Sequence, residues 1–548
     1  MKLSFKSVLV IFLVTLISSC GVSQNEKKSV AERPNIILIM SDDMGYSDLG
    51  CYGGDINTPN LDALANNGLR FTQFYNAARC CPSRASLITG LYPHQTGIGY
   101  MTNSPKKLTD QDLGLPAYQG RLHKNNVTIA EVLQKSGYST LMTGKWHLGF
   151  TKDNAPLERG FDKFYGLIAG ASNFFKPEVP RGITYMNEAV TITDEDYYTT
   201  DAFTNYAIDF IDESQNEDSK KPFFLYLAYT APHWPLHAPQ EDVEKYKGKY
   251  MKGWEQMREE RFAKMKTMGL IDEDWKLSPD DFKPWDALSN EKKIEMDLRR
   301  AIYSAMVDRM DQNIGKLIKN LEKKKILDNT IIIFLNDNGA CAEGGDFGAG
   351  PSEQLETKEG YFLSYGKYWA NASNTPYREY KHWVHEGGIS TPFIVHWPKG
   401  IAKEDQGKII NEHAFLPDVM STLVDLGQAE YPKQFKGNDI PPMVGKSLKP
   451  LFSDADASIH NEPIFWEHEG NKAVRLGDYK LVSKWSKAHE VQWELYDIKA
   501  DRTETNNLAS QMPEKVETMH ELYADWAKSN KVMPWADIKK RIKEKRKS

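Results

Sequence analysis

The feature that most constrains the fold is an alternation of short apolar runs with helical patterns between residues 33 and 450. Continuous apolar runs are typical of strands buried on both faces, and their alternation with helices predicts a largely parallel sheet covered by helices on both sides. A long amphipathic pattern predicts a helix over residues 300–323, and Thr128 to Glu131 reads as a capping box that opens another. The predicted strands span residues 36–40, 138–143, 223–229, 331–335 and 392–397.

After residue 451 the pattern changes to short strands separated by tight turns, such as Gly477-Asp478, followed by a helix over 513–528. We therefore expect an α/β domain over 34–451 and a smaller antiparallel α+β subdomain over 452–548. Within the first, residues 244–298 break the alternation and predict a helical insertion. The predicted strands of the subdomain span residues 463–468, 473–476, 479–484 and 493–498.

The last ten residues are strongly basic. We expect a solvated, fraying tail there, and contact with an anionic partner is the alternative. Over the whole chain, 69 Lys and Arg balance 75 Asp and Glu to a net charge of -6, which gives no support for a nucleic-acid partner.

The N-terminus has the pattern of an export signal. Residues 1–20 combine a basic start, an apolar run over 8–17 and small residues leading to Cys20. The run is too short for a stop-transfer helix, so it favours a signal peptide. The ending resembles a bacterial lipobox, which implies cleavage before Cys20, a lipid on its thiol and a flexible tether over 21–33. We expect an exported lipoprotein of the periplasm, outer membrane or cell surface, held to a membrane only by this anchor; a plain secretory signal is the alternative.

Two acidic clusters come directly after predicted strands. Asp42 and Asp43 come after the first strand, and Asp337 and Asn338 come after the strand at 331–335. Ligands of open α/β sheets gather outside the carboxyl ends of strands. Oxygen donors of this kind suit Ca²⁺ or Mg²⁺, whereas each cluster taken alone could be an ordinary turn.

A third cluster is the run Cys80-Cys81-Pro82-Ser83-Arg84. Pro82 suits the first turn of a helix, so Cys80 is expected just ahead of a helix N-terminus, where the backbone N–H groups favour an anion. Arg84 lies one turn further on and could address the same anion. The alternative for Cys80 is a buried structural cysteine.

Cys80-x-Pro-Ser-Arg with Leu87-x-Thr89-Gly90 behind it resembles the signature of the type I sulfatases, in their bacterial arylsulfatase-like branch. The resemblance implies an alkaline-phosphatase-like fold and the hydrolysis of sulfate esters. In that family a maturation enzyme oxidises the first cysteine to formylglycine, so Cys80 would be modified and Cys81 would be the variable position.

The resemblance also implies a role for each matching residue. Lys145 and Lys381 would bind sulfate, Arg84 would neutralise its oxygens, and His147 and His233 would act as base and acid. The implied ligands of one Ca²⁺, with Mg²⁺ as the alternative, are Asp42, Asp43, Asp337, Asn338 and the modified Cys80.

The implied mechanism uses the hydrate of formylglycine. One hydroxyl, activated by the cation, attacks sulfur, and His233 protonates the leaving alcohol with support from Lys381. The other hydroxyl then loses its proton to His147, sulfate is expelled and the aldehyde returns.

A sulfated small molecule or glycan is the expected substrate. Candidate contacts are Asn173 and Phe175 on one loop and Trp466 and His468 in the subdomain, each with ordinary packing as the alternative. Two other functions remain. One is phosphodiester or phosphonate hydrolysis on the same fold, and the other is glycan binding by a catalytically dead lipoprotein.

Overall fold

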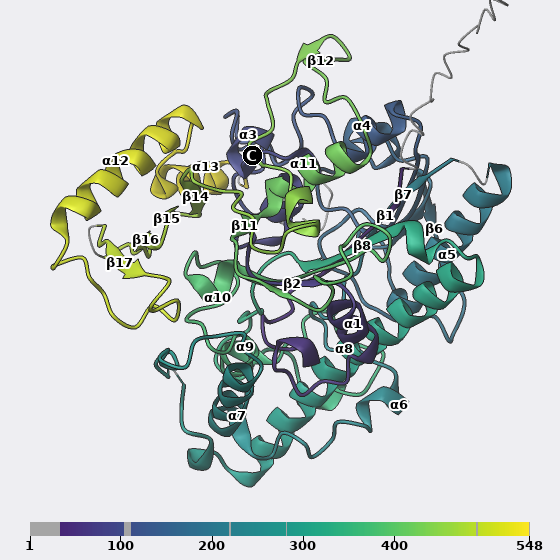
Figure 1. Cartoon of the computed structure of the whole chain (residues 1–548). Helices are drawn as coiled ribbons and strands as arrows, with labels where there is room; N and C mark the ends of the chain where they lie inside the picture. The colour runs from purple at the N-terminus through teal and green to yellow at the C-terminus, as the bar shows by residue number, and fades with distance from the viewer. Residues whose placement is uncertain (1–32, 103–110, 219–220, 281, 489–490, 547–548) are drawn as a thin grey trace, which may run out of the picture. The chain divides into compact units, whose positions relative to one another are not determined.

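The computed structural model describes residues 33–102, 111–218, 221–280, 282–488 and 491–546 (Figure 1). The predicted signal peptide, Cys20 and all of the tether except Arg33 lie outside the described residues. Within the described ranges, no helix combines the length and the apolar character needed to cross a membrane.

The main sheet has eleven strands, and its centre is parallel. Strand β1 (Asn35–Ser41) pairs in parallel with β7 (Phe223–Ala228) and β8 (Thr330–Asn336). On one side the parallel order continues through β3 (Ser139–Lys145) to β4 (Lys163–Leu167). On the other side, β9 (Ser390–His396) runs antiparallel to both of its neighbours, β8 and β2 (Leu69–Tyr75). The other strands of the sheet are short: β5 (Ile183–Tyr185), β6 (Glu188–Val190), β10 (Ile409–Ile410) and β11 (Ala414–Phe415). The predicted strands and the largely parallel α/β sheet are confirmed.

The apolar runs are buried because helices cover both faces of the sheet. In β1, Ile37 and Ile39 belong to one hydrophobic cluster, while Ile36, Leu38 and Met40 belong to another on the opposite face. The first cluster includes α1 (Pro59–Asn66), α5 (Thr199–Glu217) and α8 (Asn290–Lys323), and the second includes α2 (Cys80–Thr89), α4 (Ile129–Lys135) and α11 (Leu416–Leu426).

Capping side chains determine where two of the predicted helices begin. Thr128 accepts a hydrogen bond from Glu131 N and the Glu131 carboxylate accepts one from Thr128 N, which confirms the capping box of α4. Helix α8 begins at Asn290 rather than at residue 300, because the Ser289 side chain caps it there. The predicted insertion over 244–298 therefore includes the first turns of α8.

The C-terminal part forms a four-stranded antiparallel sheet of β14 (Ile464–His468), β15 (Asn471–Leu476), β16 (Tyr479–Ser483) and β17 (Glu494–Asp497). Helix α12 (Pro513–Ser529) packs on one face, where Trp526 stacks on Phe465 with ring centroids 5.2 Å apart. The other face packs against residues of β2 and β11, beside the main sheet (Figure 1).

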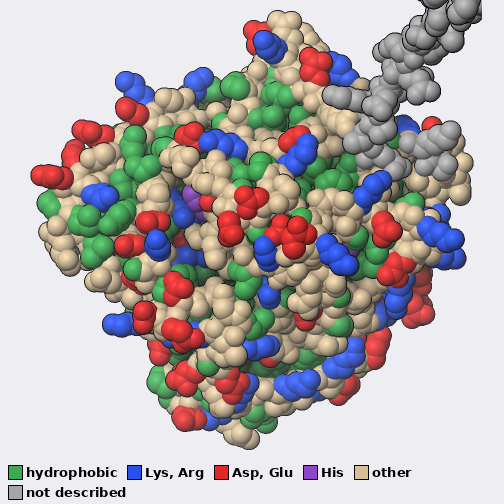
Figure 2. Space-filling view, in the orientation of Figure 1, with side chains coloured by type: hydrophobic (Ala, Val, Ile, Leu, Met, Phe, Trp, Pro, Cys, Tyr) green, Lys and Arg blue, Asp and Glu red, His purple; other side chains and the backbone are tan. Residues whose placement is uncertain are grey.

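The basic tail over 539–548 is solvated as expected but helical rather than frayed, since its described residues, 539–546, are exposed apart from the half-buried Ile542, and a helix that begins before the tail runs through most of them. Helix α13 (Trp535–Lys545) carries Ile538 fully buried against Tyr100, Leu113 and Tyr118. Its apolar residues have a helical spacing that the high density of Lys and Arg obscures. On the face seen in Figure 2, acidic and basic side chains are interspersed rather than separated into fields of one sign.

The other regular elements are the 15-residue helix α7 (Gly253–Thr267) and a set of shorter ones. The shorter ones are α3 (Pro93–Thr96), α6 (Gln240–Val243), α9 (Gly366–Ser373), α10 (Glu386–Ile389), β12 (Gln434–Phe435), β13 (Asn438–Asp439) and the 3₁₀ turns η1 (Gly50–Tyr52), η2 (Lys152–Asn154), η3 (Leu157–Arg159), η4 (Trp285–Ala287), η5 (Leu327–Asn329), η6 (Ser352–Gln354) and η7 (Lys449–Phe452).

Candidate active site

The polar clusters meet at the carboxyl edge of the parallel strands. In the sheet register, Ser41 lies opposite Asn336, and Ala228 lies opposite both Met40 and Gly144. The residues after these strands therefore emerge side by side, which brings together groups separated by hundreds of positions.

Asp43 lies at the centre of the cluster. Its Oδ2 accepts from Lys381 Nζ at 2.7 Å and lies 3.3 Å from His233 Nε2. Its Oδ1 accepts from Asn338 Nδ2 at 2.7 Å, and its backbone N–H donates to Asp337 Oδ1 at 3.2 Å. Asp43, which follows β1, is thus joined to residues that come after β7 and after β8.

Two buried oxygens in this cluster lack a hydrogen-bond partner among the described residues: Asn338 Oδ1, and Asp42 Oδ1, which lies 3.6 Å from Arg84 Nη2. Asp42 Oδ2 accepts from Lys145 Nζ at 2.7 Å, yet burial and then repulsion by Asp337 raise the pKa of Asp42 well above its ordinary value. Orphaned buried oxygens beside carboxylates that repel one another fit a hard divalent cation, which would satisfy the oxygens and favour the charged carboxylates.

The Cys80 thiol lies beside this acidic cluster. Cys80 is the first residue of α2, with Arg79 as the N-cap, so the helix begins one residue earlier than predicted. Its fully buried Sγ is 3.9 Å from Asp43 Oδ1, and burial raises the pKa of the thiol. An unmodified thiol here is therefore uncharged and a poor nucleophile.

Cys81 faces elsewhere. Its Sγ accepts from the backbone N–H of Thr102 at 3.3 Å and contacts the Thr102 hydroxyl at 3.4 Å. The four described cysteines are all free thiols.

Three cations face the acidic cluster. The Arg84 guanidinium donates to Asp337 Oδ2 from Nε at 3.1 Å and from Nη2 at 2.8 Å, and its Nη1 donates to the Lys145 carbonyl. Lys145 and Lys381 each donate to one aspartate, and all three cationic side chains are almost completely buried. The cations hold their positions before any anion binds, so little reorganisation is needed when one arrives.

Two histidines complete the cluster. His147 Nε2 lies 3.0 Å from the Thr102 carbonyl oxygen, so Nε2 carries the proton and Nδ1, which has no partner among the described residues, presents its lone pair. Burial, and then Lys145, lowers the pKa of His147 well below its ordinary value. His233 Nδ1 lies 2.7 Å from the Trp234 carbonyl oxygen, which leaves Nε2 facing Asp43 and Lys381. Burial lowers the pKa of His233 to about 3.

Sequence reasoning missed the residues that brace the loops. Asn374 Oδ1 accepts from Tyr46 N at 3.4 Å and from Ala340 N at 3.1 Å, while Nδ2 donates to Glu379 O at 3.1 Å. One amide therefore ties together the loops that carry Asp43, Asn338 and Lys381. Nothing in the local sequence signals this role, because its partners are backbone groups of distant segments.

The four predicted substrate contacts do not gather in one place. Asn173 is buried and uses its amide within the fold, donating to Lys358 O and accepting from Phe175 N and Lys176 N. Phe175 lines a cavity of about 400 Å³ to which no residue of the acidic cluster contributes.

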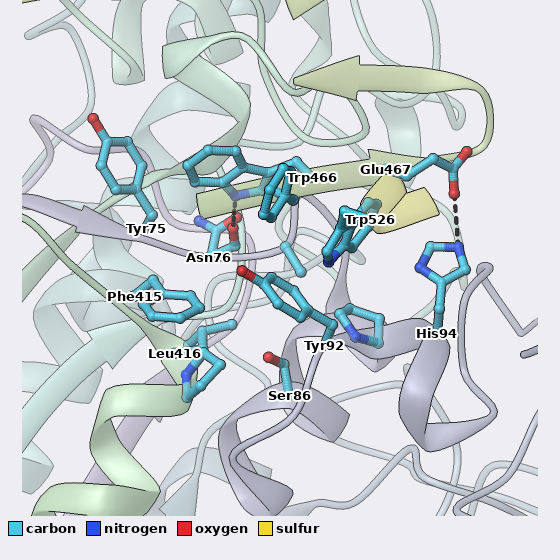
Figure 3. A pocket seen from close by; sticks show the side chains of 14 residues that line it. Tyr75, Asn76, Ser86, Tyr92, His94, Phe415, Leu416, Trp466, Glu467 and Trp526 are labelled. Atoms are coloured by element: carbon cyan, nitrogen blue, oxygen red, sulfur yellow. Dashed lines mark hydrogen bonds and ion pairs between the residues drawn. The ribbon is translucent and has the colours of Figure 1, made fainter. Parts of the chain in front are cut away.

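Trp466 is also committed within the fold. Its indole N–H donates to Asn76 O at 2.9 Å, beside a cavity of about 20 Å³ that has room for about one water molecule (Figure 3). His468 alone lies near a catalytic candidate, since its ring contacts that of His382, the neighbour of Lys381. The structure thus gives no support to Asn173, Phe175 or Trp466 as contacts at the acidic cluster.

Comparisons with known proteins show which family the chain belongs to. The family model described as "Sulfatase" matches residues 34–429, and "N-sulphoglucosamine sulphohydrolase, C-terminal" matches residues 378–531. An uncharacterised sulfatase of Schizosaccharomyces pombe is 34% identical over 91% of this chain and 94% of its own length. The arylsulfatase of Klebsiella aerogenes is 36% identical over 77% of this chain and 92% of its own length.

A solved structure has a similar overall fold. The crystal structure of Ps i-CgsB superposes with a TM-score of 0.67 at 26% identity and covers 91% of this chain and 93% of its own. The family model spans most of the chain, and the catalytic-residue pattern predicted from sequence lies in one cluster. The chain therefore belongs to the sulfatase family and is a sulfuric ester hydrolase.

Proposed function

We propose that this protein hydrolyses sulfate esters of carbohydrates with a formylglycine made from Cys80 and one Ca²⁺. The observation that carries the proposal is the position of the Cys80 thiol. Cys80 is the first residue of α2, and its Sγ lies 3.9 Å from Asp43 Oδ1, in the same cluster as the Asp42 and Asn338 oxygens that lack a hydrogen-bond partner among the described residues. A thiol whose pKa is raised by burial has no evident use as a nucleophile, whereas an oxidised side chain at the same position would reach both the cation and the sulfate.

The donors Asp42, Asp43, Asp337 and Asn338 would hold the cation, which supplies charge neutralisation and lowers the pKa of a coordinated hydroxyl. Mg²⁺ remains the alternative, and the number of oxygen donors favours Ca²⁺ because Mg²⁺ usually retains several waters.

The side chains around the cluster divide the remaining tasks. Lys145, Lys381 and Arg84 bind the sulfate oxygens and neutralise the charge that develops as the ester bond breaks. His233 presents Nε2 on the side of Lys381, and the negative charge of a bound sulfate ester would favour a proton on this nitrogen, which the ring would then deliver to the leaving alcohol. His147 presents the free lone pair of Nδ1 and accepts the proton whose removal releases sulfate.

A carbohydrate substrate is supported by the relatives. The N-acetylglucosamine-6-O-sulfatase of Bacteroides thetaiotaomicron is 27% identical over 93% of this chain, and Ps i-CgsB has been solved in complex with k-i-k-neocarrahexaose. Maturation of Cys80 requires a sulfatase-maturing enzyme as a partner. The lipobox-like N-terminus supports export and a lipid anchor at Cys20.

The test is to produce the protein with a sulfatase-maturing enzyme and to measure the mass of the peptide containing residue 80. We expect the mass of an aldehyde or its hydrate, together with sulfate release from 4-nitrophenyl sulfate that Cys80→Ala abolishes. The matched phosphate ester should be turned over far more slowly. An unmodified thiol, in cells that modify a known sulfatase, would refute the formylglycine mechanism; faster phosphate release would refute the assigned substrate class.

A further inference from the structure

A second polar cluster lies beside Lys381 and has no task in the mechanism above. It consists of His382, His468 and Glu469. His382 Nδ1 is 3.5 Å from Glu469 Oε2, and His468 Nε2 is 3.9 Å from Glu469 Oε1. The turn between β14 and β15 thus brings two side chains of the C-terminal sheet to the loop that carries Lys381.

His468 is the residue that indicates a ligand. Its side chain is only 1% exposed, and neither ring nitrogen has a hydrogen-bond partner among the described residues. A buried imidazole with two unused polar atoms is costly unless a bound molecule satisfies them. Burial, and then His382, lowers the pKa of His468 well below its ordinary value, so the ring offers one donor and one acceptor.

The other two members are partly exposed and held in unusual backbone conformations. The side chains of His382 and Glu469 are 29% and 17% exposed, and their φ angles are +92° and +50°. Left-handed conformations of residues other than glycine cost energy and persist where the surroundings impose them. Glu469 accepts one long hydrogen bond, from Met101 N at 3.4 Å, so most of its acceptor capacity is unused.

The charges nearby select the kind of group that could bind. Lys381 pairs with Asp43 at 2.7 Å, Arg79 with Glu343 at 2.6 Å, and Lys484 with Glu379 at 2.5 Å. Each of these cations already faces a carboxylate, while Glu469 contributes an acceptor. In the described part of the chain, this arrangement suits hydroxyl donors and disfavours a second anion.

The hydrogen bonds disfavour a metal ion. His382 Nε2 lies 3.4 Å from Asn471 Nδ2, and that amide is fixed because Nδ2 also donates to His468 O while its Oδ1 accepts from Trp485 N. Nε2 of His382 is therefore an acceptor, and the proton on Nδ1 points toward Glu469. A metal would need the lone pair of Nδ1 on that side.

We propose that His382, His468 and Glu469 bind hydroxyl groups of the leaving alcohol and thereby select a sugar that carries no second anionic group close to the scissile sulfate. The inference rests on the proposed sulfatase mechanism, because it places the alcohol on the side of His233 and Lys381. It assigns substrate recognition to residues from both the α/β part and the C-terminal sheet.

The experiment uses the matured full-length protein and three kinds of substrate. These are 4-nitrophenyl sulfate, a panel of monosulfated sugars that includes galactose 6-sulfate and N-acetylglucosamine 6-sulfate, and glucosamine 2-N,6-O-disulfate. Steady-state sulfate release is compared for the native protein, Glu469→Gln, His468→Ala and the control Glu353→Gln, which changes an exposed carboxylate outside the cluster.

We expect the native protein to prefer a monosulfated sugar over the disulfated one. In Glu469→Gln and His468→Ala, kcat/KM for that sugar relative to 4-nitrophenyl sulfate should fall about tenfold, the effect of losing one hydrogen bond to substrate, chiefly through KM. The control Glu353→Gln should keep the native ratio of kcat/KM for the sugar to kcat/KM for 4-nitrophenyl sulfate. Glu469→Gln should also discriminate less strongly between the monosulfated and the disulfated sugar.

Four results would overturn the proposal and leave the sulfatase activity standing. The first is turnover of 4-nitrophenyl sulfate with no turnover of any sugar in the panel. The second is preference of the native protein for the disulfated sugar. The third is an equal loss of activity on aryl and sugar sulfates in both variants. The fourth is tight stoichiometric binding of Zn²⁺ by the calcium-loaded protein that His468→Ala abolishes, measured by calorimetry. Failure of the proposed function would look different, because 4-nitrophenyl sulfate would not be hydrolysed either.

Discussion

A fully buried network of charged side chains ties the C-terminal sheet to Glu386, in the segment that follows Lys381. Removing Lys480, the central cation of this network, should severely destabilise the protein. Lys480 Nζ donates to Glu386 Oε1 at 2.8 Å and to Glu504 Oε1 at 2.9 Å, and all three side chains are 0% exposed. Glu386 keeps Arg502, whose Nε donates to it at 2.7 Å. Glu504 would retain the backbone N–H of Glu386 as its partner but lose its cation.

The magnitude can be worked out from this geometry. Lys480→Met keeps most of the side-chain volume but leaves a carboxylate buried without a compensating charge, which costs about 3–5 kcal/mol of unfolding free energy. Replacing both charges, in Lys480→Met with Glu504→Gln, should recover about half of the loss or more, because no uncompensated charge remains. The matched control is Lys449→Met. Lys449 pairs with Asp425 at 2.9 Å on the surface, so we expect a loss of no more than about 1 kcal/mol.

The assay is urea denaturation of the purified variants, with the unfolding free energy extrapolated to water. A loss below about 1 kcal/mol in Lys480→Met, or a double variant less stable than the single one, would refute the reasoning. The first result would mean that water or rearrangement solvates Glu504, and the second would mean that the network is stabilised by packing rather than by charge.

Three further predictions concern the site and its surroundings. Removing divalent cations with a chelator should abolish sulfate release and lower the melting temperature, and Ca²⁺ should restore both; full activity in the chelated protein would exclude a cation from catalysis. A methyl group on Gly170 would lie 2.6 Å from Cε1 of His147 and would displace that ring. Gly170→Ala should therefore lower kcat about tenfold or more with little change in KM. In the control Gly182→Ala the nearest contact of the added methyl group would be 3.3 Å, so this variant should behave as the native protein. Burial opposes ionisation of Glu386, yet its cationic partners hold its pKa at about 2, against an ordinary value of 4.5. The charged carboxylate therefore stabilises the fold fully above pH 4.5. This contribution, on the order of 3 kcal/mol, is lost as the pH falls toward 2. Acid titration of stability should be flatter below pH 4.5 in Glu386→Gln, and identical acid limbs would contradict the assignment.

Much of the chemistry could be predicted from the chain because it is encoded locally. Asp42 and Asp337 come directly after apolar runs, and the strands of a parallel sheet bring the residues at their carboxyl ends to one edge. Cys80 and Arg84 lie within one short run that forms a single helix, so their relative positions depend little on the rest of the fold.

The sequence alone therefore determined the fold class, the family resemblance and the residues of the acidic cluster. Tertiary structure decided everything that depends on distant partners. Asn374 braces three loops through backbone groups far away in the chain, and the importance predicted for Lys480 arises only because Glu386 and Glu504 are buried against it.

The substrate contacts show the same division. Trp466 and His468 are two positions apart in one strand and looked equivalent, but the fold commits the first to Asn76 and leaves both ring nitrogens of the second without a partner among the described residues. The basic tail is helical rather than frayed because Ile538, just before it, packs on an apolar surface of Tyr118 and its neighbours, while the side chains of the tail stay mostly exposed. Periodicity and motif determine what a segment can do, whereas burial and partners from distant segments decide which of those options is used.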